Sequence, residues 1–314
     1  ATWSLDSGDG PNEQCVFIST EGEVAVYRGT NPVSAADWSK VGVYEITRPL
    51  GPGAIMKAGG DLLVATEVGL VPLSEAVRKD IGALSIGAAS RAIEPLWQSR
   101  AATLTSIGWQ IAKWPSENIM IVTQPEAVLS LGTCLVANLK TGAWSRFTGL
   151  DTQCICIFGG FAYFGASDGS VYKMQTTGAD DGMPYTATYL GQFEGLGLPG
   201  VQKTALQARP TFISNSPISA QVKMKADYDE VLSPPPSTVV FDASDGWDIS
   251  SWDVSVWDAG SGDGVGADDS RWAALGVTGY AHAPEIQITF GNIVAPDVEY
   301  VGQDVTMSVG ALVA

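Results

Sequence analysis

The stretch CLVANLKTGAWSRFTGLDTQCICIFGGFAYFGASDGSVYKM, residues 134–174, decides the fold of this chain. It reads as a series of short apolar runs, and the turn sequences between them are Lys140-Thr141-Gly142, Gly159-Gly160 and Ser167-Asp168-Gly169. Paired glycines and Asp-Gly provide the positive φ angles that hairpin turns need. The stretch therefore predicts a β-meander, the unit from which propellers and sandwiches are built.

A second copy of the pattern lies upstream. IMKAGGDLLVATEVGLV (residues 55–71) aligns without a gap with ICIFGGFAYFGASDGSV (residues 155–171). FISTEGEV (residues 17–24) matches FGASDGSV (residues 164–171) in its Phe, Gly and Val, as a partial third copy. Hairpins that recur at long spacing indicate radial or stacked repetition, and propeller units span roughly 40–50 residues. We therefore predict a β-propeller-like domain over residues 1–178.

The number of repeat units is left open. At the unit length above, residues 1–174 would hold about four units, which is the low end for a closed propeller. The chain lacks an initiator Met and opens on what resembles the last part of a repeat, Cys15–Tyr27. We therefore expect either processing or a missing N-terminal part.

A helical insertion is predicted at about residues 74–102. The segments SEAVRKD and AASRAIEPLWQSRAA are rich in Ala, Glu, Arg and Leu, which are good helix formers. We expect Ser74 to be an N-cap and Pro95 to kink or split the second helix. The insertion is either a surface excursion or a contact with another subunit. In the strands that follow, Trp109 and Trp114 are expected to pack between sheets.

A second β domain is predicted for residues 185–314, after the linker QTTGADDGMP at residues 175–184. IQITF and VTMSV alternate as half-buried strands do, and strands are also predicted at Tyr185–Phe193, Gln207–Ser214, Ala220–Ala226 and Thr238–Phe241. This pattern favours a β-sandwich or jelly-roll. The whole chain is thus predicted to be all-β, with one helical insertion.

The acidic composition limits the partners. The formal net charge of the 314-residue chain is −17. Affinity for nucleic acid comes mainly from cations that meet phosphates, so the chain is a poor candidate for a DNA-wrapping surface, and an anionic membrane surface is disfavoured for the same reason. The sequence shows no transmembrane run and no signal peptide, and no membrane anchor is predicted.

Most catalytic motifs fail on inspection. The sequence contains one histidine, His282, which any Ser-His-Asp or Cys-His apparatus would have to use, and its apolar neighbours favour a structural role. Gly165–Gly169 formally matches G-x-S-x-G, but the match runs strand–turn–strand where a nucleophile elbow needs strand–turn–helix. Ser167-Asp168-Gly169 also lacks the spacers of the S-x-D-x-G-x-x-W turn of propeller glycosidases.

Cysteines and clustered acids give no clear site either. Cys15, Cys134, Cys154 and Cys156 follow no secreted-scaffold spacing. Cys154 and Cys156 share one face of a predicted strand, and we predict buried free thiols, with a metal pair as the alternative. The remaining candidates are the turn acids Asp180 and Asp181, the possible weak calcium ligands Asp263, Asp268 and Asp269, and the glycine-rich GSGDGVG (Gly260–Gly266), which lacks the strand and helix of a dinucleotide loop.

Several segments resemble one family of bacteriophage virion proteins. They are ANLKTGAWSRFTG, YFGASDGSVYKM, the DDG linker, QARPTF, SSWDVSVWD and RWAALGVTGYAHAPEI, and they cover roughly residues 130–314. These segments resemble the propeller-containing tail-nozzle proteins of short-tailed phages, also described as packaged-DNA-stabilisation or tail-hub proteins. The resemblance is carried most strongly by TGAWSRFTG and DGSVYKM.

The resemblance implies a structural protein of the virion, without a catalytic residue, a cofactor or a metal site. Such nozzles form homo-oligomeric rings, commonly of six copies, below the portal and adaptor. They retain the packaged genome, close the exit channel until ejection, and support tail spikes or fibres. The acidic composition agrees with this role, because an acidic lumen lets DNA slide through without specific binding.

A carbohydrate-binding propeller or glycoside hydrolase is the alternative. Trp247, Trp252 and Trp257 recur every five residues in a Trp/Asp/Gly-rich segment, a spacing that fits neither a helix face nor a strand face. They are the first candidates for sugar stacking, with core or interface packing as the other interpretation. A paired carboxylate for glycoside hydrolysis does not stand out.

Overall fold

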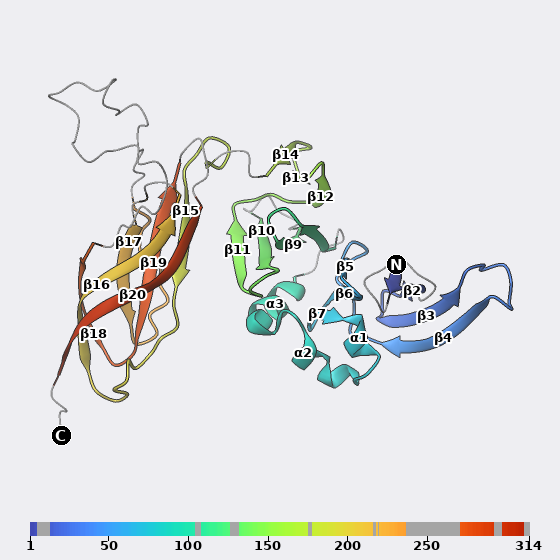
Figure 1. The fold of residues 1–314 in the computed structure, drawn as a ribbon, viewed down its shortest axis with the longest axis horizontal. Helices are drawn as coiled ribbons and strands as arrows, with labels where there is room; N and C mark the ends of the chain where they lie inside the picture. Colours follow the sequence, from blue (N-terminus) through green and yellow to red (C-terminus); the bar gives the residue numbers. More distant parts are fainter. Residues whose placement is uncertain are drawn as a thin grey trace. The chain divides into compact units, whose positions relative to one another are not determined.

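The computed structural model describes residues 1–4, 13–103, 108–125, 132–174, 178–215, 218, 220–236, 271–291 and 297–310. Its regular structure is mostly antiparallel β, with short helices between residues 73 and 101, so the predicted all-β class is confirmed (Figure 1). The chain divides into two compact units, Ala1–Met174 and Gln175–Ala314.

Unit 1, in its described part, contains four antiparallel sheets that follow one another along the chain. The first is formed by β1 (Thr2–Ser4), β2 (Glu13–Ile18), β3 (Glu23–Gly29) and β4 (Trp38–Glu45), and the second by β5 (Ile55–Ala58), β6 (Asp61–Thr66) and β7 (Gly69–Pro72). The third is formed by β8 (Gln110–Trp114), β9 (Ile119–Gln124), β10 (Thr133–Asn138) and β11 (Trp144–Thr148), and the fourth by β12 (Cys154–Phe158), β13 (Phe161–Gly165) and β14 (Val171–Lys173). Strand neighbours in each sheet are also neighbours in the chain, so each sheet is a meander.

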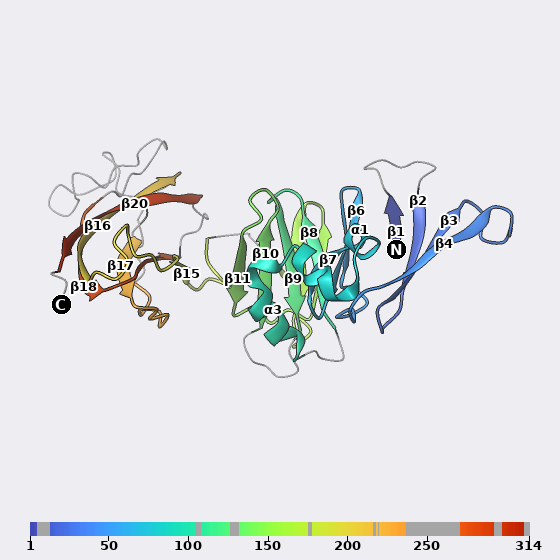
Figure 2. The same cartoon turned by 90° about the horizontal axis from the view of Figure 1, so that it is seen from below.

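Each of the four sheets packs on the next one in the chain, and Figure 2 shows the first three in this order. Successive side chains of a strand point to opposite faces, so each inner sheet contributes to two cores. The first and second sheets share a core formed by Val16, Val24, Val26, Leu62, Val64 and Val71. The second and third share Met56, Leu70, Met120, Val122 and Leu135, and the third and fourth share Ile121, Cys134, Val136 and Ala162. The described strands do not close into a ring.

In the sequence, the helical residues lie between the second and third sheets. They form α1 (Leu73–Ala76), η1 (Ile81–Ala83), α2 (Leu84–Gly87), η2 (Arg91–Ile93) and α3 (Glu94–Ala101). One of the two expected details is wrong. The N-cap of α1 is Pro72, and Ser74 lies inside the helix, where its hydroxyl donates to the Asp61 carboxylate. The expectation for Pro95 is met: the predicted second helix is split into η2 and α3, and Pro95 lies in the first turn of α3, where a residue needs no N–H donor.

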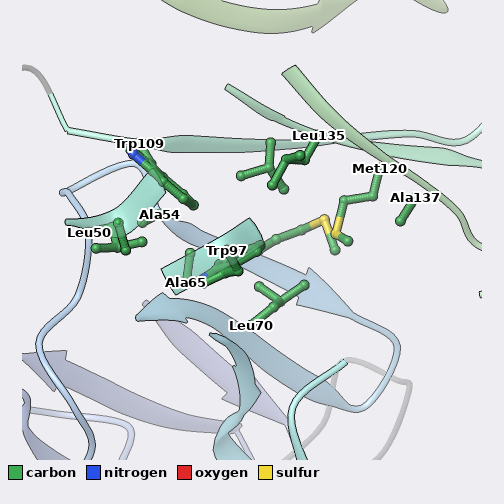
Figure 3. Packing of buried hydrophobic residues seen from close by; sticks show 12 residues of the cluster. Leu50, Ala54, Ala65, Leu70, Trp97, Trp109, Met120, Leu135 and Ala137 are labelled. Atoms are coloured by element: carbon green, nitrogen blue, oxygen red, sulfur yellow. The ribbon is translucent and has the colours of Figure 1, made fainter. Parts of the chain in front are cut away.

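The buried indole of Trp97 explains the place of α3 in the fold. This side chain is 0% exposed and fills the core between the second and third sheets, as Figure 3 shows. Its ring meets those of Trp109 and Trp144 edge to face, with centroids 5.0 and 6.1 Å apart. Its Nε1–H donates to the carbonyl oxygen of Thr66 at 2.8 Å. The helical segment thus completes a core, and Trp109 packs between sheets as expected.

The first hairpin of each repeat copy has the same register, whereas the pairing of the last strand differs by one residue between the two copies. Both β5–β6 and β12–β13 pair in the same register around a glycine-containing turn. In the second sheet Val71 pairs with Val64. In the fourth sheet Tyr172 pairs with Phe164, while Val171 lies one position earlier. The gapless alignment is therefore wrong for the last strand, because two residues connect β6 to β7 and five connect β13 to β14.

Unit 2 contains two three-stranded antiparallel sheets in its described part. One is ordered β15 (Tyr185–Leu190), β19 (His282–Phe290), β17 (Ala220–Ala226), and the other β18 (Ala273–Gly279), β16 (Lys203–Ser214), β20 (Val298–Val309). Phe212 and Ile218 pack with Ile286 and Ile288, so the two sheets share one core. The strand β18 was not predicted, and the predicted strand at 238–241 lies outside the described residues.

Candidate functional site

The single histidine of the sequence is buried in unit 2. The side chain of His282 is 1% exposed, and neither of its ring nitrogens has a hydrogen-bond partner. Its main chain is paired in both directions with Glu194, at 2.9 Å each. Its position is therefore that of a side chain enclosed by the fold, out of reach of a substrate in solvent.

Asp227 follows β17 and lies next to the histidine. Its Oδ1 accepts the N–H groups of Tyr280 and Ala281 at 2.7 and 3.1 Å. These hydrogen bonds, helped by His282 and Lys203, lower the pKa of the Asp227 carboxyl against the opposing effect of burial. The carboxylate is thus held ionised, with its hydrogen bonds directed to the loop between β18 and β19.

Glu285 is the second acid at this place, and its side chain is 1% exposed. Its two oxygens accept the Ser233 N–H and hydroxyl at 2.6 and 2.7 Å, and Lys225 Nζ lies 3.4 Å away. Burial raises the pKa of Glu285, but these hydrogen bonds and the Lys225 charge outweigh it, so the net shift is downward. The pair connects the segment after β17 to the central strand β19.

Lys203 is a buried cation at the start of β16. Its ammonium donates to the carbonyl oxygens of Leu198 and Val201 at 2.7 and 2.8 Å. We call Lys203, Lys225, Asp227, His282 and Glu285 the polar cluster of unit 2. Each of its four charged groups is engaged by the chain's own loops, so the cluster holds those loops in place. Among these five, only His282 was singled out in the sequence, because scattered Lys, Asp and Glu give no spacing signal.

The G-x-S-x-G match forms a turn. β13 ends at Gly165 and β14 begins at Val171, so the match runs from strand to strand. The Ser167 hydroxyl donates to the carboxylate of Asp151, and its N–H donates to the same carboxylate at 2.9 Å. The hydroxyl bond of Ser167, followed by the Gln153 amide, lowers the pKa of Asp151. Ser167 therefore holds a loop in place, and the motif forms a turn between two strands instead of a nucleophile elbow.

The prediction of buried thiols is wrong for both Cys154 and Cys156. Cys154 and Cys156 do share a face of β12, but that face is exposed. Ile155 and Ile157 point toward the third sheet instead, and alternation places both thiols on the opposite side. Cys134 is buried, and burial raises the pKa of its thiol, partly offset by a hydrogen bond with Thr152.

Other candidates from the sequence are only partly visible. Trp247, Trp252, Trp257, Asp263, Asp268, Asp269 and Gly260–Gly266 lie outside the described residues. Asp180 and Asp181 are exposed on a tight turn, in which Asp181 and Gly182 have φ angles of 47° and 78°. In the part of the chain that the structure describes, no group of three or more His, Cys, Asp or Glu could hold a metal ion.

Two uncovered apolar sheet faces lie at the ends of the stack in unit 1. The first-sheet outer face is defined by Phe17, Ala25, Tyr27, Trp38 and Val43, and the fourth-sheet outer face by Cys154, Cys156, Phe158, Phe161, Tyr163 and Val171. Phe158 is 76% exposed, Val171 73% and Phe17 57%. Contiguous exposed apolar surface marks interaction sites. These faces were missed in the sequence, because alternating aromatic residues in a strand read as core.

Comparisons with known proteins give no further lead: no family model matches the chain, and no curated protein matches it. Within the described residues, none of the helices has the length and apolar character needed to cross a membrane.

Proposed function

We propose that this protein is a structural component of a phage tail, a nozzle or hub ring that forms the DNA exit channel and supports spikes or fibres. One observation carries the proposal. The sheets of unit 1 stack in chain order and end in an uncovered apolar face on each side, which suits a subunit of a larger assembly. We interpret the stack as a propeller-like arc and the two sheets of unit 2 as a sandwich.

The segments that resemble tail-nozzle proteins occupy well-defined places. DGSVYKM contains β14, and TGAWSRFTG contains the turn after β10 together with β11. In unit 2, QARPTF lies within β16, and RWAALGVTGYAHAPEI runs through β18 into β19. The resemblance therefore falls on strands of the sheets in both units. The single histidine also supports a role without catalysis, because it is enclosed by the fold.

The charge of the chain supports a channel function. At a net charge of −17, a ring of this protein would present acidic groups to DNA and repel phosphate. We propose that the channel-facing residues are net acidic, so that DNA passes without specific binding. A reconstruction of the ring that shows a basic lumen would contradict this part of the proposal.

Particle mass tests the function directly. We expect native mass spectrometry and negative-stain imaging of the purified chain to show closed rings, with six copies as the expected number. A control at high salt should keep the rings, because their contacts are mainly apolar. Monomers at every concentration would contradict the proposal. Binding to a glycan array would instead favour the carbohydrate-binding alternative.

A further inference from the structure

The two copies of the repeat, in the second and fourth sheets, differ in whether one equivalent face of the sheet is covered. With an offset of one hundred residues, Met56 corresponds to Cys156, Leu63 to Tyr163 and Ala65 to Gly165. In the second sheet this face packs against the third sheet. In the fourth sheet the corresponding face is exposed. The repeat itself thus identifies the fourth-sheet outer face as a surface built to receive another sheet.

The first sheet offers a matching surface at the other end of the stack. On its outer face the ring of Tyr27 lies edge to face with Phe17, at a centroid distance of 5.8 Å, and stacks on Trp38 at 5.7 Å. Aromatic side chains held in this way present a large apolar area at little further loss of conformational entropy. Within the unit, each inner sheet turns one face to the sheet before it and the other to the sheet after it.

We infer that the first-sheet outer face of one copy packs on the fourth-sheet outer face of a second copy. The contact would continue between molecules the sheet-on-sheet order seen within one molecule. It joins two different surfaces and is therefore heterologous, so it forms a ring if the rotation closes and a filament if it does not. The inference rests on the ring of the proposed function and names the surface that would build it.

Charge complementarity favours a second copy over an unrelated partner. On the outer face of the first sheet, Glu23 and Glu45 lie opposite each other in register, and like charges in this position destabilise a sheet. The fourth-sheet outer face carries Lys173, whose ammonium lies 3.4 Å from the centroid of the Phe161 ring. A lysine from one copy against two glutamates from the next would relieve the repulsion.

The natural cysteines make the contact measurable. Cys15 lies on the first-sheet outer face, Cys154 and Cys156 lie on the fourth, and Cys134 is buried. A short bis-maleimide should therefore produce a covalent ladder from the wild-type chain. The variants Cys15→Ser and Cys154→Ser/Cys156→Ser should each give no ladder alone. Their mixture should give covalent dimers and nothing larger, because only one pair of thiols can then meet.

The other outcomes distinguish a failure of the inference from a failure of the proposed function. Crosslinks between copies of Cys15→Ser alone would show that the fourth-sheet face pairs with itself. Rings that never crosslink would show that the copies meet through another surface, and the proposed function would be retained. Monomers would remove both. Crosslinked dimers that close into a two-copy particle would support the contact and contradict the six-copy ring.

A charge exchange provides an independent readout. Lys173→Glu should weaken self-association by roughly tenfold, since it sets like charges against each other. Combining it with Glu45→Lys should restore the wild-type affinity. Equal affinity for all three proteins, measured by sedimentation, would show that these charges do not meet.

Discussion

The second and fourth sheets of unit 1 have related sequences and different surroundings. The hairpin β5–β6 is covered on both faces, by the first and third sheets. The hairpin β12–β13 has the same register, but only its inner face is covered. The difference teaches that a repeat specifies the shape of a sheet, whereas position in the stack decides which face needs a partner. The same substitution should therefore have unequal effects in the two copies.

The largest effect is expected where the second sheet is covered. Trp97→Ala should lower the free energy of unfolding by about 3–5 kcal/mol, because it removes a fully buried indole and its hydrogen bond to Thr66. Urea unfolding followed by circular dichroism measures this. Trp97→Phe serves as a control with a smaller loss, and a change below about 1 kcal/mol would show that this core does not stabilise the stack.

Equivalent positions of the repeat give the matched comparison. Met56→Ser should cost about 2–4 kcal/mol, since it leaves a cavity and a hydroxyl between the second and third sheets. Cys156→Ser should change the stability of the isolated chain by less than about 0.5 kcal/mol, because the side chain is exposed. Equal losses in dilute solution would contradict the assignment of covered and uncovered faces.

Acid should lower the stability of unit 2 more than that of unit 1, whose cores are apolar. The lowered pKa values of Glu285 and Asp227 mean that their stabilisation is present above about pH 4, the unfolded pKa, and is lost as the pH falls through the folded values. Glu285→Gln should cost about 1–3 kcal/mol at pH 7 and should flatten the acid dependence. Hydrogen exchange in β19 and β9, compared between pH 7 and pH 3, measures the acid dependence. An equal loss of protection in β9, which belongs to unit 1, would contradict a cause that is local to unit 2.

A small loss of stability is expected in the loop that distinguishes β13–β14 from β6–β7. Ser167→Ala should cost about 0.5–1 kcal/mol, because it removes one hydroxyl bond to Asp151 and leaves the main-chain bond. Thermal melting measures the change, with Ser170→Ala as the neighbouring control. Loss of an enzymatic activity without loss of stability would contradict the assignment of this motif as a turn.

Patterns of glycine and apolar residues predicted much of the fold. The glycine turns placed the hairpins, and the helix formers placed the segment that contains α1 and α3. The slip at β14 was not predictable from the alignment, because the five-residue connection changes the register without changing the apolar pattern. Pro95 could be judged from the sequence, because a proline is tolerated only in the first turn of a helix, and α3 indeed begins at Glu94 with Pro95 in its first turn.

The surfaces were harder to predict than the fold. Alternation showed that Cys154 and Cys156 share a face, but not which face meets the third sheet. Ile155 and Ile157 compete for the same core, and their larger apolar side chains occupy it. The polar cluster of unit 2 joins Lys203, Asp227 and Glu285 through contacts between distant segments, which leave no local pattern. Only His282 could be singled out from the sequence, because it is the one histidine of the chain.

Protection of Cys156 tests the central claim most directly. The claim is that the fourth-sheet outer face is exposed in one copy and covered when copies assemble. The rate of maleimide labelling at Cys156, measured from dilute to concentrated protein, should fall as particles form and should follow their mass in native mass spectrometry. A labelling rate that stays constant while large particles appear would contradict the account.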